Sequence, residues 1–171
     1  MLKILGAAAI LLASAGFLTE WRKAYTYRIK ELKFMRELYE KTAYMMETER
    51  TQIADFLARY ASDNIAPSKM MWYLTDSLKK HEFKTGEDAW KNALVQTRGW
   101  WHIKAEEEEF IRESSEGFFG RCIEENIGKL RMYEARAKQF MDSAQEDYRE
   151  KNKVITPVGM LMGIMLIIIL V

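Results

Sequence analysis

The last stretch of the chain, residues 154–171, contains no charged side chain and ends in a run of isoleucine, leucine and valine. As a helix it would be roughly 27 Å long, because each residue adds about 1.5 Å, and a bilayer has roughly 30 Å of hydrocarbon. The pattern therefore predicts a C-terminal transmembrane helix over residues 154–171.

A second uncharged stretch lies between Lys3 and Glu20, and at roughly 24 Å it is short for a membrane span. One interpretation is a cleaved signal peptide, since Ala13-Ser14-Ala15 is typical of a cleavage site and Lys3 supplies a small basic region. The other is an uncleaved transmembrane helix over residues 1–19, anchored by Lys3 and by Trp21 in the interfacial belt.

Basic side chains next to both stretches favour the uncleaved helix. They are Arg22 and Lys23 after the first stretch, and Arg149, Lys151 and Lys153 before the second. Basic flanks stay on the cytoplasmic side of a membrane. We therefore expect residues 20–153 in the cytoplasm and both termini on the far side, so that the chain forms a hairpin.

Small residues mark one face of each predicted span. They recur in steps of three and four in the first span and in a G-x-x-x-G spacing in the second: Gly6, Ala9, Ala13 and Gly16, then Gly159 and Gly163. Small faces let helix backbones approach closely in lipid, which would pair the two spans. The other interpretation is that glycine and alanine are simply common in membrane helices, because this motif is weak.

Between the spans, apolar positions repeat in steps of three and four, which is typical of amphipathic helices. The repeat predicts helices over residues 20–46, 53–61, 67–80, 86–94, 102–117 and 121–153. The first and last of these helices would continue into the spans, and Thr85 would open the fourth with a capping box. The expected fold is all-α, an antiparallel bundle of about six helices over residues 20–153 carried on two transmembrane helices.

Composition narrows the classes of function. The 171 residues include 26 Lys and Arg against 25 Asp and Glu, a net charge of +1 that argues against nucleic-acid binding. The single cysteine, Cys122, excludes an intramolecular disulfide. Only Arg121 supplies a positive charge near it, which indicates an inert thiol.

Motifs for catalysis or cofactor binding are absent from the sequence, including phosphate loops, dinucleotide fingerprints and C-x-x-C pairs. His81 and His102 lie in predicted polar turns and are interpreted as surface or capping residues rather than metal ligands. The acidic run Glu106–Glu109 is interpreted as a solvated first helical turn, which suits the helix dipole. We therefore predict a protein that is not an enzyme and that uses no cofactor or metal.

Tryptophans are dense between the spans, at positions 72, 90, 100 and 101, and most are expected in the core. Trp100 and Trp101 are consecutive, so on a helix they cannot both point to the same face. One of the two is therefore a candidate surface for a partner.

Three stretches also carry a likeness to a known family. They are the opening Met1–Gly6, the charged helix from Lys30-Glu31-Leu32-Lys33 to Met46-Glu47-Thr48-Glu49, and Gly159-Met160-Leu161-Met162-Gly163 in the terminal tail. Together they resemble the stage III sporulation protein AB family of endospore-forming bacteria, itself similar to the F domain of type II secretion platforms. The family's Thr-Pro-Leu-Pro segment is not evident near Ile53, so the chain resembles a divergent member.

This resemblance implies a membrane platform in a channel-like apparatus between mother cell and forespore, located in the mother-cell membrane. Its cytoplasmic head would contact a secretion-type ATPase, the stage III sporulation protein AA, and other components of the channel complex, and a second copy of the chain is a further candidate partner. The alternative from the residues alone is an exported protein with a cleaved signal peptide and a C-terminal anchor, acting as a helical binding module.

Overall fold

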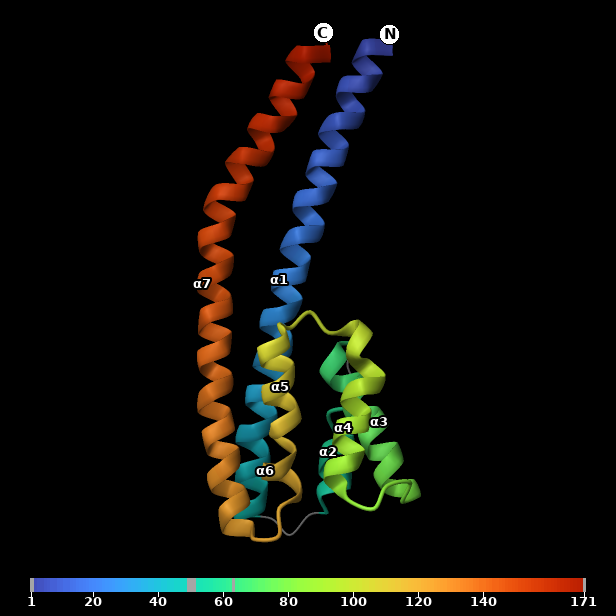
Figure 1. The fold of residues 1–171 in the computed structure, drawn as a ribbon, viewed down its shortest axis with the longest axis vertical. Coiled ribbons are helices and arrows are strands. Elements are labelled where there is room, and N and C mark those ends of the chain that lie inside the picture. Colours follow the sequence, from blue (N-terminus) through green and yellow to red (C-terminus); the bar gives the residue numbers. More distant parts are fainter. Residues whose placement is uncertain (1, 49–51, 63, 171) are drawn as a thin grey trace. The chain divides into compact units, whose positions relative to one another are not determined.

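A computed structural model describes residues 2–48, 52–62 and 64–170 (Figure 1). Side chains are not described at positions 2–15, 17–18, 156, 159–160, 162–164 and 166–170. The elements in chain order are α1 (Leu2–Thr48), α2 (Ile53–Ala58), α3 (Ala66–Lys80), α4 (Gly86–Thr97), the 3-10 helix η1 (Arg98–Trp100), α5 (Ala105–Glu113), α6 (Ser115–Phe119) and α7 (Ile123–Leu170). The described residues contain no strand, which confirms the all-α class.

The chain divides into two compact units, and the long helices α1 and α7 contribute to both. The terminal unit comprises residues 1–27 and 142–171, and the central unit comprises residues 28–141. In the central unit, Tyr39 on α1 packs beside Tyr133 on α7, and further along α1 Glu47 forms an ion pair with Arg131. Residue numbers rise on α1 as they fall on α7, so the two helices run antiparallel there.

Tyr39 shows how α1 forms the core of the central unit. The side chain is fully buried, and its hydroxyl donates a hydrogen bond to Ser114 Oγ at 2.9 Å. Its ring centroid lies 5.8 Å from that of Phe118, 5.9 Å from that of Tyr133 and 6.1 Å from that of Phe110. One side chain of α1 therefore contacts α5, α6 and α7.

Helix α3 begins and ends as the sequence predicts. Pro67 lies in its first turn, where the missing N–H has no helical acceptor to lose. At the other end His81 adopts the left-handed conformation, with φ 53° and ψ 39°. Its N–H donates to the Leu78 carbonyl and that of Glu82 donates to the Ser77 carbonyl, as in a Schellman motif. The interpretation of His81 as a capping residue is confirmed.

Helix α4 also starts at the predicted cap. Thr85 Oγ1 accepts a hydrogen bond from the backbone N–H of Asp88 at 3.1 Å. The inward face of α4 carries Trp90, which is fully buried and donates from its indole nitrogen to the Ile111 carbonyl at 2.8 Å. This bond ties α4 to α5 through the core.

The predicted helix over residues 102–117 is wrong in two places. Residues 101–104 are not helical, and Trp101 and Lys104 have extended backbones with ψ of 144° and 161°. A turn at Ser114 then separates α5 from α6. Gly117 does not end the helix but lies inside α6, where an added Cβ would come within 3.1 Å of Leu130 on α7. Its missing side chain allows this close approach.

Helix α7 continues to Leu170 and contains Pro157. A proline in a helix interior has no N–H to donate to the carbonyl four residues earlier, here that of Lys153. Among the described residues, no helix combines the length and the apolar character that a membrane span requires. The transmembrane helices expected over residues 1–19 and 154–171 remain a prediction.

The different environments of two tryptophans provide a test of this core. Replacing the buried Trp90 by Phe removes ring volume and one of the two side-chain donors to the Ile111 carbonyl, the other being Ser114 Oγ, which should lower the free energy of unfolding by about 2–4 kcal/mol. Trp72 is 53% exposed, and Trp72→Phe should cost less than about 0.5 kcal/mol. Urea denaturation of the purified full chain, followed by circular dichroism, measures both. Equal effects would contradict this packing.

Candidate functional site

In the terminal unit, aromatic rings bring α1 and α7 together. Trp21 stacks on Tyr148 with ring centroids 6.0 Å apart, and Tyr25 lies 4.9 Å from Trp21 and 6.0 Å from Tyr148. Lys151 Nζ donates to the Tyr25 hydroxyl at 2.8 Å. We call these four residues the terminal aromatic cluster. They sit one helical turn apart on each helix, so each helix presents them on one face.

A hydrogen bond beside this cluster fixes the direction of the two helices. Arg22 Nε donates to Asn152 Oδ1 at 3.2 Å. Arg22 thus pairs with residue 152, and Tyr25, three residues later, pairs with residues 148 and 151. The helices α1 and α7 are therefore antiparallel in the terminal unit, and they lie side by side there (Figure 1).

The small residues predicted to pair the two spans are mostly outside the described side chains. This applies to Gly6, Ala9, Ala13, Gly159 and Gly163, and to the anchor Lys3. Gly16 is exposed, and no described heavy atom lies within 4 Å of where its Cβ would be. Pairing through these small residues therefore stays a prediction, and the pairing among the described side chains uses large aromatic residues.

The other predicted flanking cations remain at the surface of the terminal unit. Lys23 forms an exposed ion pair with Glu20 at 2.6 Å. Arg149 and Lys153 are exposed and line a charged groove on α7 together with Glu146 and Glu150.

In the central unit, a buried ion pair joins α1 to the start of α5. The guanidinium of Arg28 donates to both carboxylate oxygens of Glu107, from Nε at 3.0 and 3.2 Å and from Nη2 at 2.5 Å. The side chains are 6% and 1% exposed. Glu107 Oε2 also accepts from the backbone N–H of Lys104 at 2.7 Å. A buried carboxylate is favourable only with such a complete set of donors.

A second pair lies one turn further along α1. Glu31 is 1% exposed; it accepts from the backbone N–H of His102 at 2.9 Å and pairs with the His102 ring Nδ1 at 2.9 Å. Burial raises the pKa of Glu31 above its ordinary value of 4.5, although the hydrogen bonds from His102 oppose this, and the negative charge of Glu107 adds to the rise.

Arg28, Glu31, His102 and Glu107 form what we call the buried ion-pair cluster. It holds residues 101–104 extended along α1, which explains why the predicted helix does not begin at His102. It also corrects the interpretation of Glu106–Glu109 as a solvated turn, because Glu107 is buried. A sequence signal existed: Arg28 and Glu31 fall in register with the buried Leu32 and Met35 on α1.

Trp100 and Trp101 directly precede His102 of the cluster in the chain and face different surroundings. Trp101 packs against the core, and its indole nitrogen donates to Thr97 Oγ1 at 3.1 Å. Trp100 is 44% exposed, and Lys69 Nζ lies 4.4 Å from its ring centroid.

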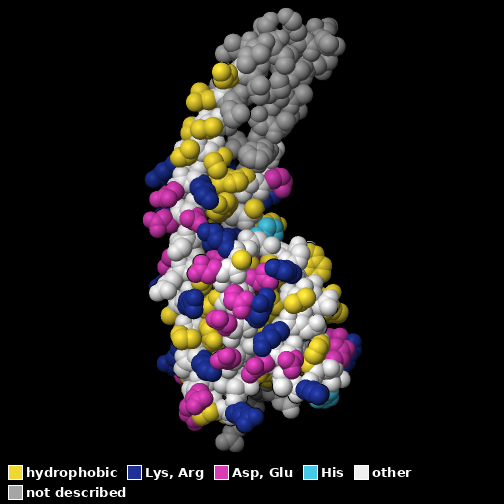
Figure 2. Space-filling view, viewed as in Figure 1, with side chains coloured by type: hydrophobic (Ala, Val, Ile, Leu, Met, Phe, Trp, Pro, Cys, Tyr) yellow, Lys and Arg dark blue, Asp and Glu magenta, His cyan; other side chains and the backbone are white. Residues whose placement is uncertain are grey.

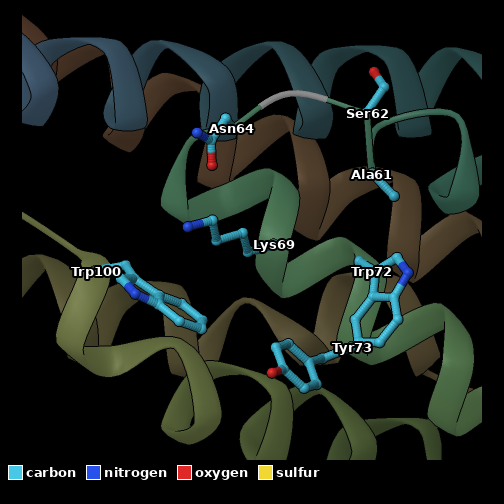
Figure 3. Close-up of a pocket in the computed structure, with 7 residues that line it drawn as sticks. All are labelled: Ala61, Ser62, Asn64, Lys69, Trp72, Tyr73 and Trp100. Carbon is cyan, nitrogen blue, oxygen red and sulfur yellow. The ribbon is translucent and has the colours of Figure 1, made fainter.

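Trp100 also lines an open cavity of about 360 Å³, the aromatic pocket (Figure 3). Helix α3 contributes three of its residues in a spacing that places them on one face, and the connection between α2 and α3 contributes three more. The lining residues are Lys69, Trp72 and Tyr73 from α3, Trp100 from η1, and Ala61, Ser62 and Asn64 from the connection.

No group of three or more His, Cys, Asp or Glu side chains in the described part of the chain is arranged to hold a metal ion. Cys122 is half-buried, and its thiol lies 3.2 Å from a carboxylate oxygen of Glu124.

Two long antiparallel helices with shorter helices packed against them in the central unit define an all-helical bundle protein. The model of the family described as Stage III sporulation protein AB matches residues 3–171. The chain therefore belongs to the stage III sporulation protein AB family, which confirms the resemblance drawn from the sequence. No curated protein and no solved structure matches the chain.

The buried ion pair makes a prediction about stability. Arg28→Met strands the buried Glu107 charge and should lower the free energy of unfolding by about 3–5 kcal/mol. Adding Glu107→Leu removes that charge and should restore more than half of the loss, although the N–H of Lys104 stays uncapped. Lys33→Met, at an exposed charge on the same helix, should change stability by less than about 0.5 kcal/mol. Denaturant titration measures the free energy of unfolding of each variant, including Glu107→Leu alone. If the loss in the double variant equals the sum of the losses in the two single variants, this account is contradicted.

Glu31 makes a prediction about pH. Because the folded protein holds the Glu31 proton more tightly than the unfolded chain, its contribution to the free energy of unfolding decreases as the pH rises above 4.5. Glu31→Gln keeps an acceptor for the His102 N–H but removes the titration. The stability of the unsubstituted chain relative to this variant should therefore rise as the pH falls from 7 toward 4.5. A constant difference across this range, measured by urea denaturation at each pH, would refute the assignment.

Proposed function

We propose that this protein is a non-enzymatic membrane platform of the sporulation channel apparatus, with both terminal helices in the mother-cell membrane and the central unit in the cytoplasm. One observation carries the proposal: an uninterrupted apolar stripe on α7 faces outward. Val154, Val158, Leu161 and Met165 are 61%, 47%, 65% and 65% exposed. Steps of four, three and four residues place them on one side of the helix (Figure 2).

Such a stripe is unfavourable in water, at roughly 25 cal/mol for each Å² of apolar surface, and lipid removes this cost. The terminal aromatic cluster supports the same placement. It lies between the charged part of each long helix and the uncharged end, where tryptophan, tyrosine and lysine anchor helices at a membrane interface. In this arrangement the cluster holds the two helices together at the cytoplasmic surface of the bilayer.

The central unit is suited to contacts with proteins rather than with nucleic acid. The chain carries a net charge of +1, and the visible face of the central unit mixes basic and acidic side chains without a large area of one sign (Figure 2). The likeness of the family to the F domain of secretion platforms supports contact with a cytosolic secretion-type ATPase and with other channel components. The protein would then transmit position or force between that ATPase and its membrane partners.

Cysteine labelling tests the proposed topology. In a Cys122→Ser chain expressed in intact, non-sporulating cells, a cysteine added after Val171 should react with a membrane-impermeant maleimide. A cysteine at the exposed position Lys84 should react only after the cells are permeabilised, because the membrane would shield the central unit. Labelling at position 84 but not at the C-terminus in intact cells would exclude the proposed topology. It would favour the exported alternative, in which the single C-terminal anchor leaves the end of the chain on the cytoplasmic side.

A further inference from the structure

Two exposed tryptophans from separate elements line the aromatic pocket. Trp72 on α3 is 53% exposed and Trp100 on η1 is 44% exposed. Tyr73 lies between them, with its ring centroid 4.9 Å from Trp72 in an edge-on contact and 6.5 Å from Trp100 in a stacked one. The three rings make a continuous apolar wall (Figure 3). Exposed tryptophans gathered in a pocket are typical of binding surfaces.

Two hydrogen-bond donors at the pocket have no partner among the described residues. The buried tryptophans of this unit have acceptors, since Trp90 donates to the Ile111 carbonyl and Trp101 to Thr97 Oγ1. Among the described atoms, the indole nitrogens of Trp72 and Trp100 have no such acceptor. An indole N–H can only donate, so a ligand that contacts either ring can meet it with an acceptor.

Among the described residues, Lys69 at the pocket has no carboxylate partner. Lys69 Nζ lies over the Trp100 ring at 4.4 Å, and no described residue that lines the pocket is acidic. Two other cations on the same elements are paired: Lys80 with Asp76 at 2.6 Å on α3, and Arg98 of η1 with Glu108 at 3.2 Å. An ammonium group has three donors and no acceptor, so the chemistry complementary to Lys69 is a carboxylate.

We propose that the aromatic pocket binds an acidic segment of a partner protein. One carboxylate of the segment pairs with the Lys69 ammonium, and an apolar side chain next to it packs against the rings of Trp72, Tyr73 and Trp100. The volume of about 360 Å³ accommodates one such anchor rather than a whole helix. This inference rests on the proposed function only for the cytoplasmic location of the pocket, and it does not depend on which protein supplies the segment.

Site-specific photocrosslinking tests the proposal in sporulating cells that produce the full chain. A benzophenone amino acid replaces Trp100 in one variant and Tyr44 in a matched control, because Tyr44 is a 64% exposed aromatic on α1 outside the pocket. Mass spectrometry then identifies the crosslinked peptide. The expected adduct at position 100 lies within about five residues of two or more Asp or Glu, close enough for a carboxylate to reach Lys69.

Charge reversal separates binding from mere proximity. With the crosslinker at position 100, Lys69→Glu should lower the adduct yield about tenfold because it places like charges together, whereas Lys69→Arg should preserve it. Near-ultraviolet circular dichroism of each purified variant, to which the buried Trp90 contributes, shows whether that variant is folded. If Lys69→Glu does not fold, Lys69→Gln replaces it and should lower the yield several-fold.

The other possible results of the crosslinking experiment either overturn or support the proposal. An adduct with a basic or uncharged segment, with lipid, or with a second copy of this chain would overturn the proposal. So would the absence of an adduct at position 100, or a yield that is indifferent to the charge at position 69. An acidic segment of the secretion-type ATPase would support both this inference and the ATPase contact, whereas an acidic segment of another protein would support the pocket alone.

Discussion

The ion pair between Arg28 and Glu107 determines the arrangement of the segment that leads into α5. Two charges with 6% and 1% exposure are stable in the interior only when each finds its full set of partners. Glu107 meets this condition by accepting from Arg28 and from the backbone of Lys104. The start of α5 is therefore held at one position along α1, and the extended residues before it, with Trp101 packed inward and Trp100 outward, follow from that constraint.

The two units use different chemistry to join the same two helices. In the central unit, α1 and α7 pack through buried side chains around Tyr39, with α5 and α6 completing the core. In the terminal unit, the contact consists of aromatic rings that carry polar groups, a lysine and an arginine–asparagine hydrogen bond. Side chains that combine an apolar ring or stem with a polar group are favoured at the interface between water and lipid, which is the environment proposed for them.

The sequence predicts those parts of the fold that depend on local signals. Helices α3 and α4 could be located because Pro67 and Thr85 act on their own first turns, and the burial of Trp90 follows from its spacing to Ala93 and Leu94. The extended segment before α5 could not be predicted, because Glu31 and His102 are 71 residues apart and nothing local opposes a helix there. Likewise, the aromatic pocket needs Trp72 and Trp100 on neighbouring elements, a tertiary arrangement that neither residue's own neighbours encode.

The central claim is that α1 and α7 run antiparallel and in contact at the terminal aromatic cluster, so that the central unit is held by a pair of helices. In a Cys122→Ser chain, cysteines at Arg22 and Asn152 should be joined within one chain by a short bismaleimide, since these side chains are hydrogen-bonded at 3.2 Å. Cysteines at Lys23 and Asn152 should crosslink much less, because Lys23 points to the exposed side of α1. Equal crosslinking of both pairs, or products formed only between chains, would contradict the account.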